Sequence, residues 1–105
     1  MLVELDIFTG RPNPRWELDE QSRDELERLQ AGLDPANERP AEPPGLGYRG
    51  FSYSVASGHC RAFHGHVQCP GGLLADPSSS IERFLLDRLP AEFAPLRERI
   101  AATFA

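Results

Sequence analysis

The chain has 105 residues, of which 40% are hydrophobic, so it is long enough for one domain with a small core. Its formal net charge is -5, from 16 acidic residues and 11 basic residues, all of them arginine. This acidic balance argues against general nucleic-acid binding, and the sequence lacks the run of about 20 apolar residues that spans a membrane. The N-terminus has no charged segment typical of a secretory signal, so we expect a cytoplasmic protein.

The first third of the chain predicts a strand followed by a helix. Residues 2–8 alternate between apolar and acidic side chains, which is typical of a half-buried strand. Leucines at helical spacing predict a helix over 18–33. Asp19 is its candidate N-cap and Gly32 its candidate stop. The next segment, 34–45, holds four prolines and predicts a surface connector within a single domain, 1–105.

Two turn signals in the middle of the chain predict a meander of three strands. Ser57-Gly58 and His64-Gly65 are both typical of two-residue hairpin loops. Loops at these positions place strands over 50–56, 59–63 and 66–69.

The register that follows from these loops gives the meander one apolar and one polar face. The first loop places Tyr53 opposite Ala62, and the second places Cys60 opposite Cys69. The apolar side chains then project from the same side, including Phe51. We therefore expect that face to pack against the core.

The last third predicts two helices, over 79–89 and 91–104. Ser79 and Glu82 have the spacing of a capping box, and Pro90 separates the helices. The order of elements is thus β-α-β-β-β-α-α. We expect an α+β domain with a four-stranded, mainly antiparallel sheet and its helices packed on one face.

Five residues of two types suited to metal binding fall within a short stretch: His59, Cys60, His64, His66 and Cys69. The predicted register opposes a shared site, because it turns Cys60 and Cys69 to the apolar face and His59 and His66 to the polar face. It instead brings the two cysteines side by side, close enough for a disulfide. In a cytoplasmic protein we expect them to stay reduced and to pack as small apolar residues.

Catalytic motifs find little support in the sequence. There is no GxSxG element and no convincing pair of catalytic carboxylates, and the glycine-rich stretches lack the context of a phosphate loop. We therefore favour a protein that is not an enzyme and needs no cofactor.

The stretch TGRPNPRW, residues 9–16, has two interpretations. As architecture, it is a stiff turn that brings Trp16 onto the core. As a binding loop, its stiffness leaves little entropy to lose, and Arg49 approaches it if the first two strands are neighbours. Arg11, Asn13, Trp16 and Arg49 then form a small site for an anion or a peptide terminus.

The same motif carries a family resemblance. LDIFTGRPNPRW, followed by LGYRGF and later by IERFLLD, resembles an uncharacterised group of short bacterial and fungal proteins with a [ST]GRPNPxW motif and a downstream LGYRGF motif. The resemblance covers most of the chain and implies a shared fold and site without naming an activity. The histidines and cysteines depart from the pattern, so a metal or thiol role is not implied for the group.

The leading hypothesis is a small binding or accessory module that recognises a protein or peptide partner through Arg11, Asn13, Trp16 and Arg49. The alternative is a metal- or thiol-dependent protein that uses the histidine and cysteine cluster. A third hypothesis is a subunit whose apolar face over 81–89 is covered by a partner. No oligomeric state is predicted.

Overall fold

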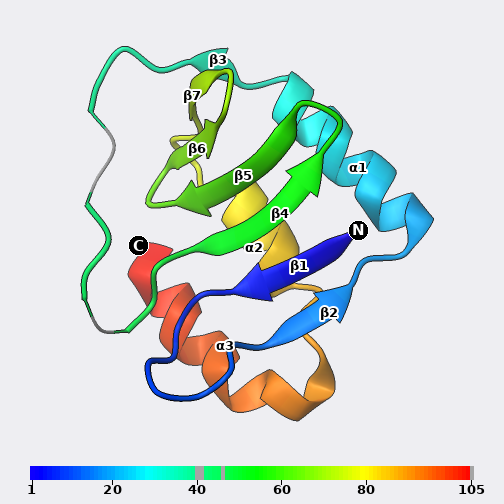
Figure 1. The fold of residues 1–105 in the computed structure, drawn as a ribbon, viewed down its shortest axis with the longest axis vertical. Helices are drawn as coiled ribbons and strands as arrows, with labels where there is room; N and C mark the ends of the chain where they lie inside the picture. The colour runs from blue at the N-terminus through cyan, green and yellow to red at the C-terminus, as the bar shows by residue number, and fades with distance from the viewer. Residues whose placement is uncertain (40–41, 46, 105) are drawn as a thin grey trace.

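The protein is described by a computed structural model that covers residues 1–39, 42–45 and 47–104. Its centre is one antiparallel sheet of seven strands in the order β2-β1-β4-β5-β6-β7-β3 (Figure 1). The strands are β1 (Leu2–Leu5), β2 (Arg15–Glu17), β3 (Asp34–Pro35), β4 (Phe51–Val55), β5 (Gly58–Phe63), β6 (His66–Cys69) and β7 (Gly72–Ala75). The helices are α1 (Glu20–Ala31), α2 (Ser80–Leu86) and α3 (Ala94–Ala101), with 3₁₀ turns at Ala91–Phe93 and Ala102–Phe104.

The prediction of a four-stranded sheet is wrong, because three short strands extend the sheet. β2 returns antiparallel along β1, with Trp16 opposite Val3. β7 pairs with β6, and the two-residue β3 forms the far edge along β7. Strands this short show little periodicity of their own, so their pairing depends on the neighbouring backbone rather than on a sequence pattern.

The proline-rich segment 34–45 is therefore more than a connector. Its first two residues form β3, and the amide of Ala36 donates to the carbonyl of Leu73 at 2.9 Å. Residues 40 and 41 lie outside the described residues. The described residues form a single compact α+β domain.

The helices lie on one side of the sheet. Figure 1 shows α2 behind the sheet, α3 below the strands and behind the β1–β2 loop, and α1 beside the strand ends; α1 and α3 both contact α2. The predicted apolar face of the meander is confirmed, because Phe51, Tyr53, Cys60, Ala62 and Val67 are buried there and Val55 and Cys69 are half-buried. Val3 and Leu5 of β1 are also buried. The helices bury Ile81, Phe84, Leu85, Leu86, Leu96 and Ile100 against them. The apolar face of 81–89 thus belongs largely to the protein's own core.

The second hairpin has the predicted register and the first does not. Phe63 pairs with His66 across the His64-Gly65 loop, where both φ angles are positive. In the first hairpin Tyr53 pairs with Cys60, so the strands are shifted by two residues from the predicted pairing with Ala62. A shift of two keeps every side chain on its predicted face.

The position of Gly58 explains the shift in the first hairpin. Gly58 has a φ of +127°, and a Cβ there would lie 2.8 Å from the Pro70 side chain. Glycine is therefore needed at the start of β5, and the loop is formed by the two residues before it.

The helix ends show one confirmed cap and one wrong prediction. Asp19 caps α1, and its Oδ1 accepts from the amide of Ser22 at 2.7 Å. The capping box at the start of α2 does not form, because Ser79 has a positive φ and makes no side-chain cap. Asp76 replaces it, accepting from the amides of Ser80 and Ile81.

Glu82 is free for another role because it is not part of a cap. Its side chain is buried, accepts from the hydroxyl of Tyr48, and accepts from the amide of Gly65 at 3.3 Å. It thereby joins α2 to the segment before β4 and to the β5–β6 turn. None of the helices in the described part of the chain has the length and hydropathy that crossing a membrane requires.

At Gly50 the segment before β4 lies close against β5. The φ of Gly50 is +103°, and a Cβ at this position would lie 2.4 Å from the carbonyl oxygen of Ala62. Both the backbone angle and the neighbouring strand therefore require glycine.

We expect Gly50→Ala to lower the free energy of unfolding by about 3 kcal/mol or more, because strained φ and a backbone clash act together. Gly47→Ala is the matched control, since Gly47 has a φ of +86° but open space around a Cβ. That variant should lose only about 1–2 kcal/mol. Urea unfolding measures both, and equal losses would show that Ala62 does not constrain position 50.

Candidate functional site

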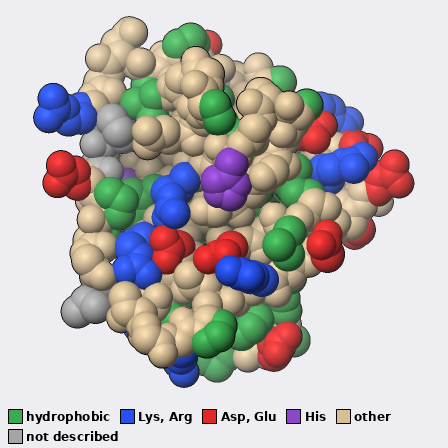
Figure 2. Space-filling model, in the orientation of Figure 1, with side chains coloured by type: hydrophobic (Ala, Val, Ile, Leu, Met, Phe, Trp, Pro, Cys, Tyr) green, Lys and Arg blue, Asp and Glu red, His purple; other side chains and the backbone are tan. Residues whose placement is uncertain are grey.

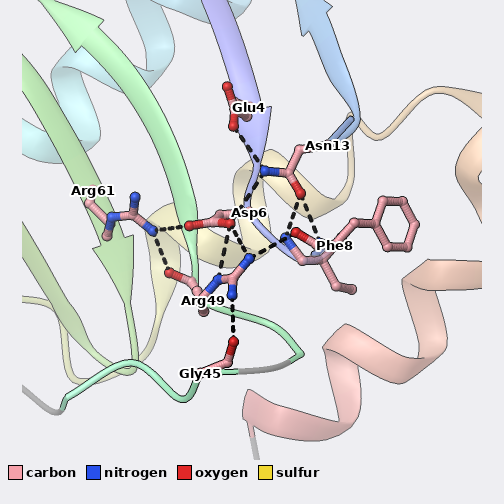
Figure 3. A network of polar contacts seen from close by, with 8 residues as sticks. Glu4, Asp6, Phe8, Asn13, Gly45, Arg49 and Arg61 are labelled. Carbon is pink, nitrogen blue, oxygen red and sulfur yellow. Dashed lines mark hydrogen bonds and ion pairs between the residues drawn. The ribbon is translucent and has the colours of Figure 1, made fainter. Parts of the chain in front are cut away.

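The 9–14 loop is held by the side chain of Asn13. Its Oδ1 accepts from the amides of Ile7 at 3.1 Å and Phe8 at 2.8 Å. Its Nδ2 donates to Glu4 at 3.0 Å and to Asp6 at 3.3 Å (Figure 3). The side-chain amide of Asn13 thus forms hydrogen bonds with β1 and with the residues just after it, and these bonds make the loop rigid.

Asp6 is the centre of an ionic cluster on the face of the sheet that the helices leave uncovered. Arg49 donates to its Oδ1 from Nη2 at 2.8 Å and from Nε at 3.1 Å. Arg61 donates to its Oδ2 from Nη1 at 2.8 Å. Both carboxylate oxygens are therefore engaged by guanidinium groups from two different parts of the chain (Figure 3).

Arg49 also ties this cluster to two loops. Its Nη2 donates to the carbonyl of Phe8 at 2.9 Å, and its Nη1 donates to the carbonyl of Gly45 at 2.8 Å. Arg61 in turn donates to the carbonyl of Arg49 at 2.9 Å. Arg49 is only 17% exposed, so it acts mainly as an internal clamp.

The two arginines set the ionisation of Asp6. Burial raises the pKa of its carboxyl, but the hydrogen bonds and charges of Arg61 and Arg49 outweigh burial and hold the pKa below the usual 3.8. The folded state therefore binds this proton less tightly than the unfolded state. The stability that the carboxylate adds is present at neutral pH and is lost as the pH falls through the folded pKa.

Trp16 supports the architectural interpretation of the loop. It lies on β2 opposite Val3, and its ring meets the buried ring of Phe51 edge to face, with centroids 6.3 Å apart. Its indole nitrogen is buried without a hydrogen-bond partner among the described residues. Trp16 thus caps the core from the helix side of the sheet.

Arg11 points outward from the loop. It is exposed, and its guanidinium carbon lies 3.7 Å from the centroid of the Phe8 ring. The described part of the chain offers it no hydrogen bond or ion pair. A stacked guanidinium keeps its N–H groups free at the ring edge, so Arg11 is a preoriented cation.

The structure therefore separates the four residues of the predicted site. Asn13 and Arg49 both contact Asp6, whereas Arg11 lies at the loop surface and Trp16 packs on the core. The expected approach of Arg49 to the loop is confirmed, since β1 and β4 are neighbours.

Asp6 and Arg61 were missed as site residues. The one sequence signal that points to them is the alternation of apolar and polar residues along the strands, which places both on the polar face. Their pairing depends on the strand order β1-β4-β5, which alternation does not reveal.

The histidines and cysteines do not converge. Cys60 and Cys69 form a disulfide, with Cα atoms 4.3 Å apart, so the expectation of reduced thiols is wrong for this structure. His59 lies beside the hydroxyl of Ser54, and His66 lies beside Glu38. The described residues contain no group of three side chains placed to hold a metal ion.

Comparison with family models, curated proteins and solved structures found no match to the chain. The resemblance to short bacterial and fungal proteins with the [ST]GRPNPxW and LGYRGF motifs stays a prediction. Leu46 of the second motif lies outside the described residues.

We expect Asp6→Asn to lower the free energy of unfolding at pH 7 by about 2 kcal/mol, because two partly buried guanidinium groups lose their charged partner. The difference from wild type should shrink below about pH 4, where the wild-type carboxylate also takes up a proton. Denaturant unfolding at a series of pH values measures both effects.

Glu17→Gln is the matched control for this experiment. Glu17 is also an acidic residue of the polar side of the sheet, on the edge strand β2, but its side chain is 73% exposed and pairs with the N-terminal amine. We expect a change within about 0.5 kcal/mol. A loss for Asp6→Asn that is the same at every pH would contradict the ionic role of Asp6.

Proposed function

We propose that the chain is a non-enzymatic binding module that contacts an acidic protein or peptide segment through its polar sheet face. This face is the uncovered side of β1, β2, β4 and β5 together with the 9–14 loop. Its charged side chains are Glu4, Asp6, Arg11, Arg15, Glu17, Arg49 and Arg61. Figure 2 shows basic and acidic groups gathered over the middle of the sheet, around an exposed histidine.

The observation that carries the proposal is the rigidity of this charged surface. Asn13, Arg49 and Arg61 have their side chains fixed by the bonds that meet at Asp6. A partner would therefore meet side chains that have little conformational entropy left to lose. Structural needs alone explain Asn13 and Arg49, but they do not explain a stacked, exposed Arg11.

The charge of the polar sheet face favours an acidic partner. Four arginines share it with three carboxylates, while the whole chain carries a net charge of -5. Two of these arginines are directed at Asp6, and Arg15 donates to Glu4 at 2.9 Å. Arg11 is the cation left for a carboxylate supplied from outside.

This interpretation changes the roles that the sequence predicted for the residues of the site. Arg11 becomes the contact residue, while Asn13 and Arg49 become positioning residues that hold the loop. Trp16 supports β2 from the core side. A partner that approaches the polar sheet face would contact Arg11 first and the half-exposed Arg61 next.

We expect a hexaglutamate peptide to shift the amide resonances of residues 8–15, 49 and 61 in a two-dimensional NMR titration. Arg11→Ala should weaken binding about tenfold, because it removes a charge-assisted contact. Arg99→Ala is the matched control, since Arg99 is also exposed but lies on α3, on the helix side. We expect it to leave affinity unchanged.

Two outcomes of the same titration would contradict binding at the polar sheet face. Shifts confined to the helices, or equal losses for Arg11→Ala and Arg99→Ala, would show that net charge and not the polar sheet face attracts the peptide. Both variants should keep the wild-type unfolding midpoint, because neither arginine is part of the Asp6 cluster.

A further inference from the structure

A cleft lies on the other side of the molecule from the 9–14 loop, between the end of α1, the β4–β5 turn at Ser57 and the β6–β7 turn at Gly71. Its volume is about 450 Å³, which is within the range of small-molecule sites. Its lining is mostly apolar and includes Pro35, Ala36, Leu73 and Leu74. An adjoining hollow of about 430 Å³ shares Gln30, Ser57 and Leu74 with it.

The Cys60–Cys69 disulfide borders this cleft, and its two ends differ. Cys69 lines the cleft and is half-buried, whereas Cys60 is 1% exposed and belongs to the core. An incoming thiolate therefore reaches Cys69 first. Attack there breaks the sulfur–sulfur bond and leaves Cys60 as the departing thiolate.

Gln30 is placed to assist that departure. Its Nε2 lies 3.5 Å from Cys69 Sγ and 3.7 Å from Cys60 Sγ. A neutral disulfide is a weak acceptor, so this contact gains little before the reaction. It becomes a charge-assisted hydrogen bond once a thiolate forms, which lowers the barrier to exchange.

Tyr53 fixes the orientation of Gln30. Its hydroxyl donates to Gln30 Oε1 at 2.7 Å, which directs Nε2 towards the sulfurs. Burial raises the pKa of Tyr53, so its hydroxyl keeps its proton and remains a donor. Tyr53, Gln30 and the disulfide thus form a chain of contacts from the core to the cleft.

We propose that the cleft is a thiol–disulfide exchange site at which a low-molecular-weight thiol attacks Cys69. The first thiolate forms a mixed disulfide with Cys69 and releases the Cys60 thiolate, which takes up a proton. A second thiol then attacks the mixed disulfide at the sulfur of the bound thiol and releases Cys69. Two thiols are oxidised to one small disulfide, and the protein disulfide is reduced to two cysteines. This inference does not depend on the proposed partner binding.

The first test uses glutathione as the probe and follows the reduction of the oxidised protein by alkylation and mass spectrometry. We expect Gln30→Met to slow reduction about fivefold or more, because the departing thiolate loses its donor. Gln21→Met is the matched control, since Gln21 lies on the same helix but is exposed. It should react at the wild-type rate, and equal rates for all three proteins would overturn the role of Gln30.

The second test identifies the attacked sulfur and compares Cys60→Ser with Cys69→Ser, each treated with oxidised glutathione. The thiol left in Cys60→Ser should form a mixed disulfide at least about tenfold faster than the thiol left in Cys69→Ser, because only Cys69 lines the cleft. Equal rates, or faster reaction at Cys60, would overturn the proposal. Peptide mapping of quenched wild type provides the same readout without removing the disulfide.

Discussion

The paired contact of Arg49 and Arg61 with the carboxylate of Asp6 organises this protein. It joins β1, the segment before β4, and β5, which lie far apart in the sequence. Because Arg49 also holds the carbonyls of Phe8 and Gly45, the same cluster positions two loops. Partly buried charges are costly unless each is paired, so loss of one member affects the others. The rigid shape of the 9–14 loop follows from this constraint as much as from its prolines.

This constraint gives the two sides of the sheet different roles. The apolar side holds the core and supports Trp16 through Phe51. The polar side is stabilised by ion pairs and hydrogen bonds, which keep its side chains ordered without a covering helix. Two features lie near opposite ends of the sheet: the exposed cation of Arg11, which belongs to the polar side, and the Cys69 sulfur in the cleft. The proposed binding and the proposed thiol chemistry therefore use separate surfaces.

Strand alternation, turn residues and helix caps correctly predicted the elements that depend on neighbouring residues in the sequence. Alternation identified β6 with its correct ends, the His64-Gly65 loop identified the second hairpin, and Asp19 and Gly32 identified the ends of α1. The neighbouring positions of Cys60 and Cys69 followed from the same register. Features that depend on tertiary context were missed. Asp76 caps α2 from outside the expected motif, and Glu82 is recruited instead by Tyr48.

In the candidate site, too, the features set by local sequence were predictable and those set by tertiary context were not. The stiffness of the loop and the approach of Arg49 were predictable from glycine, proline and strand adjacency. The separation of Trp16 from Arg11 was not, because it requires β2, a strand of three residues that alternates Arg15 outward and Trp16 inward. The central place of Asp6 required the order of three strands. Neither composition nor spacing contains that order.

Hydrogen exchange at the amides of Ile7 and Phe8 tests most directly whether the Asp6 cluster holds the loop. Both amides donate to Asn13, whose own amide group is anchored on Glu4 and Asp6. We expect slow exchange at both positions in the wild-type protein, and a parallel loss of protection in Asp6→Asn and Asn13→Ala. Fast exchange at both amides in the wild-type protein would contradict the account, because the loop would then be mobile despite its bonded neighbours.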